Sequence, residues 1–490
     1  MNARESAVLH SVLERLLAPL GASALVLADG TSLLVHPGSP VDIATLPHAA
    51  ALCHKYLNLA DGDIAIANDP YSGGTTLSDF TLVLGIKTES ASTDVLLARR
   101  ISCSPRLADS GKLDDEGVRV PPTPLASRGE VNRDLLQAIA AAPLAPSHLA
   151  EMVLAAIDEM KEVATRIRHL AQDPESVLRK SVFKTYLADC SRSFEAAMGR
   201  LPLGTIQAAY QFPTGETLKL QLRLNEDHLQ FDFGGTESSK TIAITDLAAL
   251  GACTAAVWAV FGEDIPLNTG SLHHLQVSAP SRTMLAAAPP VGTNRGMTEG
   301  AAAISRLAYE AIAKLTPALK SAKGAATTSC FQIKFEDGRS LSFTAPPGSG
   351  ASSTHEGVTA FTPWANCTDF VSHPEQIEAE WPVRFVSAGV RVGSGGKGKR
   401  NGGDGVSIGF TTLKSGELTW MASSLGVRHD GENSGRAGQP AELEILRIKS
   451  GVREELKTLS GRVRVEAGDQ VFFLSPGGGG SGEPANDAAD

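Results

Sequence analysis

The sequence predicts a large mixed α/β (α+β) protein with a helical middle segment and a β-rich C-terminal half. Over the first 320 residues, short apolar runs with period two alternate with apolar stripes at three- and four-residue spacing. The first pattern is typical of strands and the second of amphipathic helices. Beyond residue 320 the period-two pattern dominates. The chain of 490 residues is long enough for several domains or for one large core.

The first three parts of the chain mix strands and helices. Residues 1–130 form an N-terminal α/β part, with helices at 6–20 and 47–57, a hairpin around Asp29-Gly30, and strands at 63–67, 80–86 and 94–101. Residues 131–200 are helical, because apolar positions such as Val153, Ile157 and Met160 share one helical face. Residues 201–320 form a second α/β part, with an antiparallel hairpin over 217–233 and helices at 243–260 and 299–315.

The last two parts differ from the first three in residue pattern and composition. Residues 321–474 form a β-rich part that carries a Gly-rich loop at 393–405. Residues 475–490 are acidic and rich in glycine, and we expect them to form a mobile tail.

Composition and charge exclude several functional classes. A net charge of −10 without a basic cluster argues against binding to nucleic acid or to a membrane surface. Six cysteines without a C-x-x-C spacing argue against a zinc ribbon or a disulfide scaffold. The N-terminus lacks a signal-peptide pattern, and no apolar run reaches about 18 residues. We therefore expect a cytoplasmic protein.

Residues 68–79 separate two strand-like runs and are the first candidate site. Their sequence is Asn-Asp-Pro-Tyr-Ser-Gly-Gly-Thr-Thr-Leu-Ser-Asp, which is longer than a hairpin needs. Asp69-Pro70 starts a turn, and Gly73-Gly74 permit positive φ. The hydroxyls and carboxylates can bind a metal or a ligand. The alternative is a surface loop whose polar groups bond only to each other.

Three other patterns suggest chemistry less specifically. The loop at 393–405 has three cations among seven glycines, which suits a phosphate, although a tight loop between two strands is the favoured interpretation. Asp69 and Asp79 offer hard oxygen ligands, but the twelve histidines include no H-x-x-x-H pair. Ser349 lies in Gly-Ser-Gly without the full nucleophile elbow, and Cys103 has no assignable histidine partner.

Six motifs occur in a fixed order: the 68–79 loop, Glu-Gly-Val-Arg-Val-Pro-Pro at 116–122, Phe-Asp-Phe-Gly-Gly-Thr at 231–236, Ile-Pro-Leu-Asn-Thr-Gly at 265–270, Pro-Glu-Gln-Ile-Glu at 374–378 followed by Trp-Pro, and the Gly-rich loop at 393–405. Together they resemble the hydantoinase B/oxoprolinase family. That family includes B-type subunits of ATP-dependent hydantoinases, the C-terminal part of 5-oxoprolinase, and subunits of acetone and acetophenone carboxylases.

The resemblance implies a large hydantoinase B-like subunit that works in a hetero-oligomer. Its expected partner is an A-type subunit, which binds ATP and phosphorylates the substrate; a second B-type subunit is an open alternative. The B-type subunit then hydrolyses the activated cyclic amide, or joins an activated ketone to carbon dioxide.

The resemblance also assigns site residues. The catalytic candidates are Asp79, Asp69, Cys103 and Arg119. The candidates for substrate or phosphate binding are Asn68, Tyr71, Gly73, Gly74, Thr75, Thr76, Ser394, Gly395 and Gly396.

The sequence departs from the family where metal-binding histidines are expected. Thr76 and Asp42 each replace one histidine, residues 102–105 lack the family's histidine pair, and residues 361–368 replace its histidine-rich run. Threonine is not a strong ligand for transition metals. A Zn or Mn site is therefore expected to be absent or altered, with Asp79 and Asp42 as the remaining candidate ligands.

Three hypotheses follow from these matches and departures. The chain is an active cyclic-amide hydrolase or ketone carboxylase subunit with an altered site. Alternatively, it is a catalytically degenerate B-type subunit that scaffolds or regulates the complex. The third alternative is an unrelated protein that binds a sugar or a phosphate.

Overall fold

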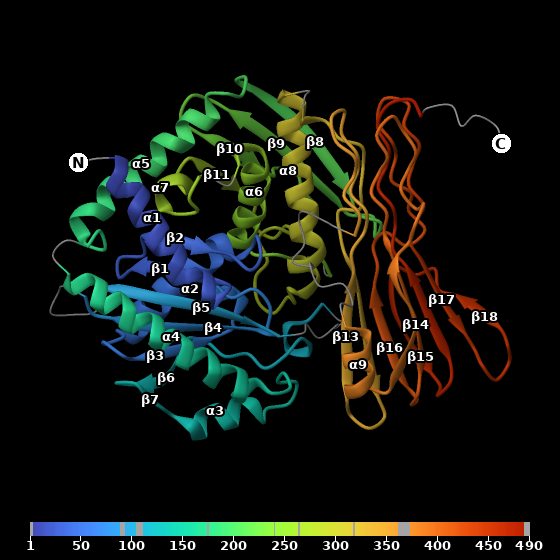
Figure 1. The fold of residues 1–490 in the computed structure, drawn as a ribbon, viewed down its shortest axis with the longest axis horizontal. Coiled ribbons are helices and arrows are strands. Elements are labelled where there is room, and N and C mark those ends of the chain that lie inside the picture. Colours follow the sequence, from blue (N-terminus) through green and yellow to red (C-terminus); the bar gives the residue numbers. More distant parts are fainter. Residues whose placement is uncertain are drawn as a thin grey trace. The chain divides into compact units, whose positions relative to one another are not determined.

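The computed structural model describes residues 3–88, 94–103, 111–173, 176–239, 241–262, 265–316, 319–360 and 373–484. The chain divides into two compact units (Figure 1). The first comprises Met1–Ala209 and Leu218–Leu315, and the second comprises Tyr210–Thr217 and Thr316–Asp490. The mixed α/β class is confirmed, and the division after Leu315 lies close to the expected start of the β-rich part. No described helix has both the length and the apolar character needed to span a membrane.

The first unit is built on a seven-stranded antiparallel sheet in the order β2-β1-β5-β4-β3-β6-β7. Its strands are β1 (Ser23–Leu27), β2 (Ser32–His36), β3 (Ile64–Ala67), β4 (Asp79–Ile86), β5 (Val95–Ser102), β6 (Thr123–Ser127) and β7 (Glu130–Val131). The hairpin expected around Asp29-Gly30 joins β1 to β2, and Gly30 has a φ of 93° there.

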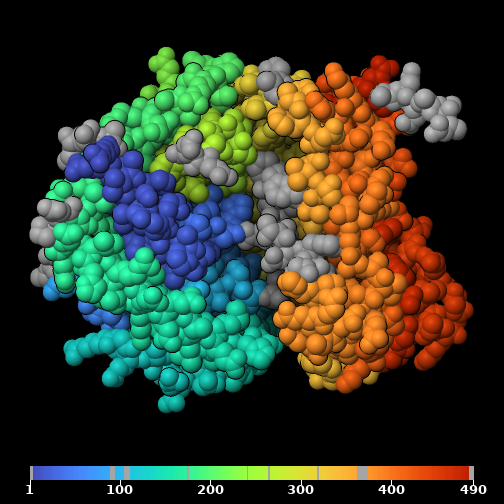
Figure 2. All heavy atoms as spheres, viewed as in Figure 1, coloured from blue at the N-terminus to red at the C-terminus, as the bar shows by residue number. Residues whose placement is uncertain are grey.

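Both faces of this sheet are buried under helices. One face packs into a core with α1 (Ala3–Leu17), α4 (Leu149–Gln172) and α5 (Lys180–Met198). In Figure 2 the blue atoms of α1 lie beside the green atoms of α4 and α5. The other face packs against α2 (Asp42–Leu57). Alternate residues of a strand point to opposite faces, so the central strands are apolar at nearly every position rather than at every second one.

The helical middle segment is confirmed as α3 (Arg133–Ala140), α4 and α5. The stripe that contains Val153, Ile157 and Met160 is buried on α4. A second sheet of the first unit has the order β11-β10-β9-β8. The predicted hairpin over 217–233 forms its antiparallel pair β9 (Thr217–Leu224) and β10 (Leu229–Asp232), and β11 (Leu275–Ser278) joins β10 in parallel.

The remaining elements of this region are β8 (Gly204–Gln211), α6 (Asp246–Phe261), α7 (Thr269–Leu272) and α8 (Ala301–Leu315). A turn of π-helix, Gly296–Gly300, leads into α8.

The second unit is β-rich, as predicted. One of its sheets contains β12 (Ser329–Phe335), β13 (Ser340–Ala345), β16 (Gly416–Met421) and β19 (Ser460–Val465). The other contains β14 (Val383–Val390), β15 (Val406–Thr412), β17 (Glu442–Leu446), β18 (Arg453–Glu455) and β20 (Gln470–Leu474), and the helix α9 (Pro374–Glu380) precedes β14. Aromatic and branched side chains from both sheets share one core.

The segment that follows β20 corrects the expectation of a mobile tail. Residues 475–481 are buried, and the N–H groups of residues 477–482 donate to carbonyls of the segments around Lys323, Arg400, Gly403 and Arg436. The glycine content predicts a flexible segment. In the structure, the absence of glycine side chains instead lets neighbouring backbones approach closely. Residues 485–490 lie outside the described residues.

Candidate functional site

The 68–79 loop joins β3 to β4, which are neighbours in the seven-stranded sheet. Asn68 is fully buried at its start. Its amide donates to the carbonyls of Leu77 (2.8 Å) and Val118 (2.7 Å), and its oxygen accepts from the N–H of Val120 (2.7 Å). The amide therefore ties the loop to the segment at 118–120. Asn68 holds the site in shape, because its amide groups are already used within the chain.

Asp69 and Arg119 form a second tie. The Asp69 carboxylate accepts from the Tyr71 N–H, from the Ser72 hydroxyl and from Arg119 Nη2 at 2.8 Å. It is buried, whereas the Arg119 side chain is 44% exposed. Tyr71 donates its hydroxyl to the Val291 carbonyl at 2.6 Å, and burial raises its pKa to about 12. Asp69 thus caps the turn at Pro70–Ser72, and Arg119 keeps part of its surface open.

The glycine pair allows the loop to lie directly on α2. Gly73 has a φ of 85°, and a Cβ there would come within 2.6 Å of the Ala49 nitrogen. A Cβ at Gly74 would come within 2.5 Å of the Asn68 carbonyl oxygen. Both positions exclude side chains, so the glycines set the backbone path and bring Thr75 and Thr76 to the start of β4.

Asp79 is the half-buried carboxylate at the end of the loop. Its Oδ2 accepts from the Thr75 hydroxyl at 2.7 Å and from the Thr76 hydroxyl at 3.1 Å. Burial raises the pKa of Asp79, although these hydroxyls and the nearby Arg100 guanidinium oppose the shift. A carboxyl group with a raised pKa in a partly open position is suited to proton transfer.

Cys103 lies beside this group, just after β5. Its N–H donates to the Ser78 carbonyl, and burial together with the Asp79 charge raises the pKa of its thiol to about 12. The thiol therefore stays protonated at neutral pH, and the geometry does not support a thiolate nucleophile.

Arg100 is the central residue that the sequence did not indicate. It lies on β5, and its Nε stands 3.3 Å from Asp42 Oδ1. Its Nη2 donates to the Thr45 hydroxyl and to the Gly73 carbonyl, and its Nη1 donates to the Thr75 hydroxyl. The Thr75 hydroxyl in turn donates a hydrogen bond to Asp79 Oδ2. One guanidinium thus contacts Asp42 directly and is connected to Asp79 through the Thr75 hydroxyl.

Glu116 is the other residue that sequence reasoning missed, although it begins a quoted motif. The side chain is buried, and its two oxygens accept from the N–H groups of Thr293 (2.9 Å) and Asn294 (3.0 Å). Burial raises its pKa to about 7. The Thr293 hydroxyl in turn donates to the Thr75 carbonyl, so Glu116 links the loop to the entry of the π-helical turn.

The residues present do not fit a divalent metal. Among the described residues, no group of three or more His, Cys, Asp or Glu side chains is placed to hold one. Asp42 and Asp79 are the expected ligands, but Arg100 already supplies a positive charge to Asp42 and, through Thr75, to Asp79. The departures at 104–105 and 361–368 lie outside the described residues.

The Gly-rich loop in the second unit forms no open anion cradle. The N–H groups of Gly393 and Gly395 donate to the Asp404 carboxylate, and that of Gly396 donates to the Gly478 carbonyl. The Ser394 hydroxyl donates to Asp404 and accepts from the Gly405 N–H. The predicted phosphate donors are therefore engaged with the chain itself. The structure brings residues 68–79, Asp42, Cys103 and Arg119 into one unit, and Ser394, Gly395 and Gly396 belong to the other.

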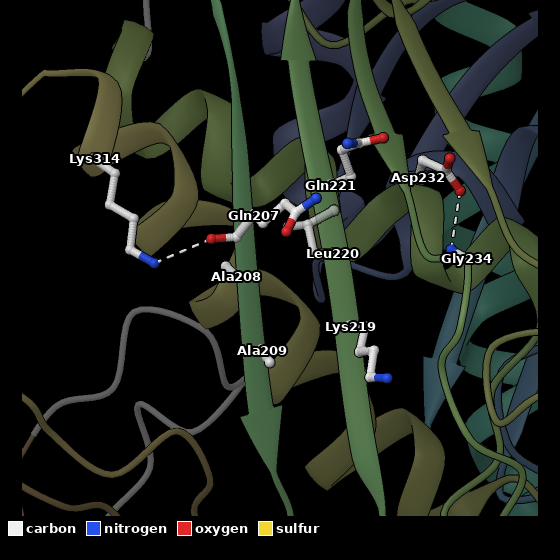
Figure 3. A pocket seen from close by; sticks show the side chains of 9 residues that line it. All are labelled: Gln207, Ala208, Ala209, Lys219, Leu220, Gln221, Asp232, Gly234 and Lys314. Carbon is white, nitrogen blue, oxygen red and sulfur yellow. Dashed lines mark hydrogen bonds between the residues drawn. The ribbon is translucent and has the colours of Figure 1, made fainter.

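A separate cavity of about 570 Å³ lies on the outer surface of the β8–β9–β10 sheet (Figure 3). Lys219, Gln221 and Asp232 point toward it, and Lys314 reaches from α8 to donate to the Gln207 carbonyl at 3.3 Å. Asp232 is engaged with the Gly234 N–H. None of the predicted site residues lines this cavity.

Comparison with known proteins gives a consistent result. The family model described as hydantoinase B/oxoprolinase matches residues 21–484. An uncharacterized protein of Methanocaldococcus jannaschii is 25% identical, with 95% of this chain and 84% of that protein covered. A 5-oxoprolinase of Pestalotiopsis fici is 23% identical over 94% of this chain, which spans 38% of that relative's length.

Two solved structures share the fold. An ATP-dependent caprolactamase from Pseudomonas jessenii superposes with a TM-score of 0.85 at 16% identity, covering 99% of this chain and 91% of that chain. A nucleotide-free acetone carboxylase superposes with a TM-score of 0.77 at 13% identity, covering 96% of this chain and 72% of that chain.

Proposed function

The chain belongs to the hydantoinase B/oxoprolinase family, and from that premise we propose that it is the B-type component of an ATP-dependent cyclic-amide hydrolase. The alternative reaction is that of a related ATP-dependent ketone carboxylase. The observation that carries the proposal is the family match over residues 21–484. An A-type partner binds ATP and phosphorylates the substrate, and this chain acts on the activated carbon.

Within the 68–79 loop, Asp79 is the residue suited to transfer protons during hydrolysis. An amide carbon reacts slowly with water until its oxygen carries a phosphoryl group. Asp79 is half-buried, its pKa is raised, and two threonine hydroxyls orient it. It accepts a proton from the attacking water as the new C–O bond forms, and it returns that proton to the ring nitrogen when the C–N bond breaks. The phosphoryl group then remains on the carboxyl oxygen as an acyl phosphate, and water hydrolyses this to the carboxylate and inorganic phosphate. Arg119, exposed at the same loop, is suited to bind an anionic group of the substrate.

A second candidate function is a catalytically degenerate subunit that scaffolds the complex. The observation that favours it is Arg100, because its guanidinium pairs with Asp42 and, through Thr75, reaches Asp79, the two carboxylates expected to bind a metal. In this case the glycines and Asn68 preserve the loop, and another B-type subunit performs the reaction.

The test is to purify the chain together with a co-expressed A-type partner. ATP-dependent ring opening is measured with caprolactam, 5-oxoproline and hydantoin, and ATP-dependent carboxylation with acetone and bicarbonate. Turnover of a cyclic amide by the two-component complex is expected. A complex that assembles but turns over only when another B-type subunit is added would contradict catalysis by this chain and support the scaffold function.

A further inference from the structure

The Arg100 side chain is unusual because it is almost fully buried at the edge of a polar loop. Only 1% of it is exposed, and that of Asp42, its ion-pair partner, is 4% exposed. A charge is strongly disfavoured in a protein interior unless it is paired and hydrogen-bonded. Arg100 meets this condition through one carboxylate, two hydroxyls and one carbonyl.

The groups around Arg100 all present oxygen atoms to the guanidinium. They are the carboxylate of Asp42, the hydroxyls of Thr45 and Thr75 and the carbonyl of Gly73, with the carboxylate of Asp79 one hydrogen bond further on. Such a set of hard oxygens is what Mg²⁺ or Mn²⁺ prefers. Here the same oxygens surround a guanidinium.

We propose that Arg100 is the permanent cation of this site and takes the place of a divalent metal. Its planar group donates in several fixed directions, so it positions Asp42, Gly73 and Thr75 together, and Thr75 in turn orients Asp79. Arg100 itself is a positioning residue, because its Nη1 and Nη2 donate within the chain and its Nε faces the Asp42 carboxylate. The chain therefore folds and keeps its loop without a metal ion, and this inference stands whether or not the chain turns over a substrate.

The first measurement is the metal content of the purified full-length protein by elemental mass spectrometry, with thermal unfolding in excess EDTA and in millimolar Mn²⁺ or Zn²⁺. Wild-type protein is expected to be metal-free, with a melting temperature that neither addition changes. One metal ion per chain that is lost in Asp42→Asn or Asp79→Asn would overturn the proposal.

The second measurement uses Arg100→Ala, which opens the space among the oxygens. This variant is expected to gain Mn²⁺ binding in calorimetry and a Mn²⁺-dependent rise in melting temperature of about 3–5 °C. Adding Asp79→Asn should abolish the gain. Arg99→Ala is the matched control, because Arg99 lies next on the same strand and pairs with the exposed Glu159; it should gain no metal.

If Arg100→Ala does not fold in metal-free buffer, Mn²⁺ in the refolding buffer is expected to restore it, and Arg100→Ala/Asp79→Asn should not be restored. A folded Arg100→Ala that binds no metal and melts like wild type would overturn the proposal. Failure of Mn²⁺ to restore an unfolded Arg100→Ala would overturn it as well.

Discussion

Glycine has different roles in the 68–79 loop of the first unit and in the Gly-rich layer of the second unit, which consists of residues 393–405 and 475–482. In the loop, two glycines bring the backbone onto α2, and a carboxylate with its hydroxyl donors is left half-buried. In the layer, the N–H groups of the glycines donate to backbone carbonyls or to the side chains of Asp404, Asn401 and Ser394. A glycine signature marks close backbone approach in both regions. In the first region the Asp79 carboxyl group has a raised pKa and accepts from side-chain hydroxyls. The Asp404 carboxylate of the second region accepts from glycine N–H groups of its own loop, and this difference makes the first region the better candidate site.

The largest predicted effect tests the packing of the layer. A Cβ at Gly402 would lie 2.0 Å from the Gly478 carbonyl oxygen, which is backbone and cannot move aside. Gly402→Ala is therefore expected to lower the free energy of unfolding by about 3 kcal/mol or more, measured by chemical denaturation. Gly389→Ala is the control in the same unit, because no atom lies within 4 Å of a Cβ there. Equal stabilities of the two variants would contradict the close packing.

The second prediction concerns Glu116 and pH. Burial raises its pKa from 4.5 to about 7, so the folded state binds a proton more tightly than the unfolded state. Its contribution to stability is fully present below pH 4.5 and is lost as the pH rises through 7. At 1.36 kcal/mol per unit, the loss is about 3 kcal/mol.

Glu116→Gln should flatten this part of the pH profile of unfolding free energy, after a small uniform loss from one missing acceptor. The exposed Glu130, changed to glutamine, is the control. A profile for Glu116→Gln that is as steep as that of wild type would show that Glu116 does not titrate in this window.

The smallest predicted effect on stability concerns Arg119. Asp69 keeps the Tyr71 N–H and the Ser72 hydroxyl when the arginine is removed, and the Arg119 side chain is 44% exposed. Arg119→Ala should therefore lower the unfolding free energy by about 1 kcal/mol or less. If Arg119 binds substrate, the variant raises KM far more than this loss implies. A large loss of stability with unchanged KM would assign Arg119 to the structure alone.

The sequence predicted what depends on local pattern. The α4 stripe with Val153 and Met160, the β9–β10 hairpin and the strand–loop–strand around 68–79 were all predicted because periodicity and turn residues determine them. The Gly-rich segment at 475–482 was read as mobile because its hydrogen-bond partners lie far away in sequence. Composition alone does not reveal those partners.

Only the part of the site that lies within one stretch of sequence was predicted. Asp79, Thr75 and Thr76 lie within one loop and were identified together. Arg100 lies in an apolar strand, and its pairing with Asp42 depends on how β5 packs against α2. Glu116 was quoted as part of a motif, but its partners Thr293 and Asn294 are more than 170 residues away. Two adjacent arginines inside an otherwise apolar strand, which point to opposite faces of the sheet, were the signal that could have drawn attention to Arg100.

The central claim is that Asp79 transfers protons in the assembled complex. The most direct test is ATP-dependent ring opening by the complex of this chain with its A-type partner, comparing wild type with Asp79→Asn. The variant is expected to lose about 100-fold or more in kcat, with a melting temperature equal to wild type or higher, because the amide removes a partly buried carboxylate. Wild-type turnover by Asp79→Asn would contradict the account.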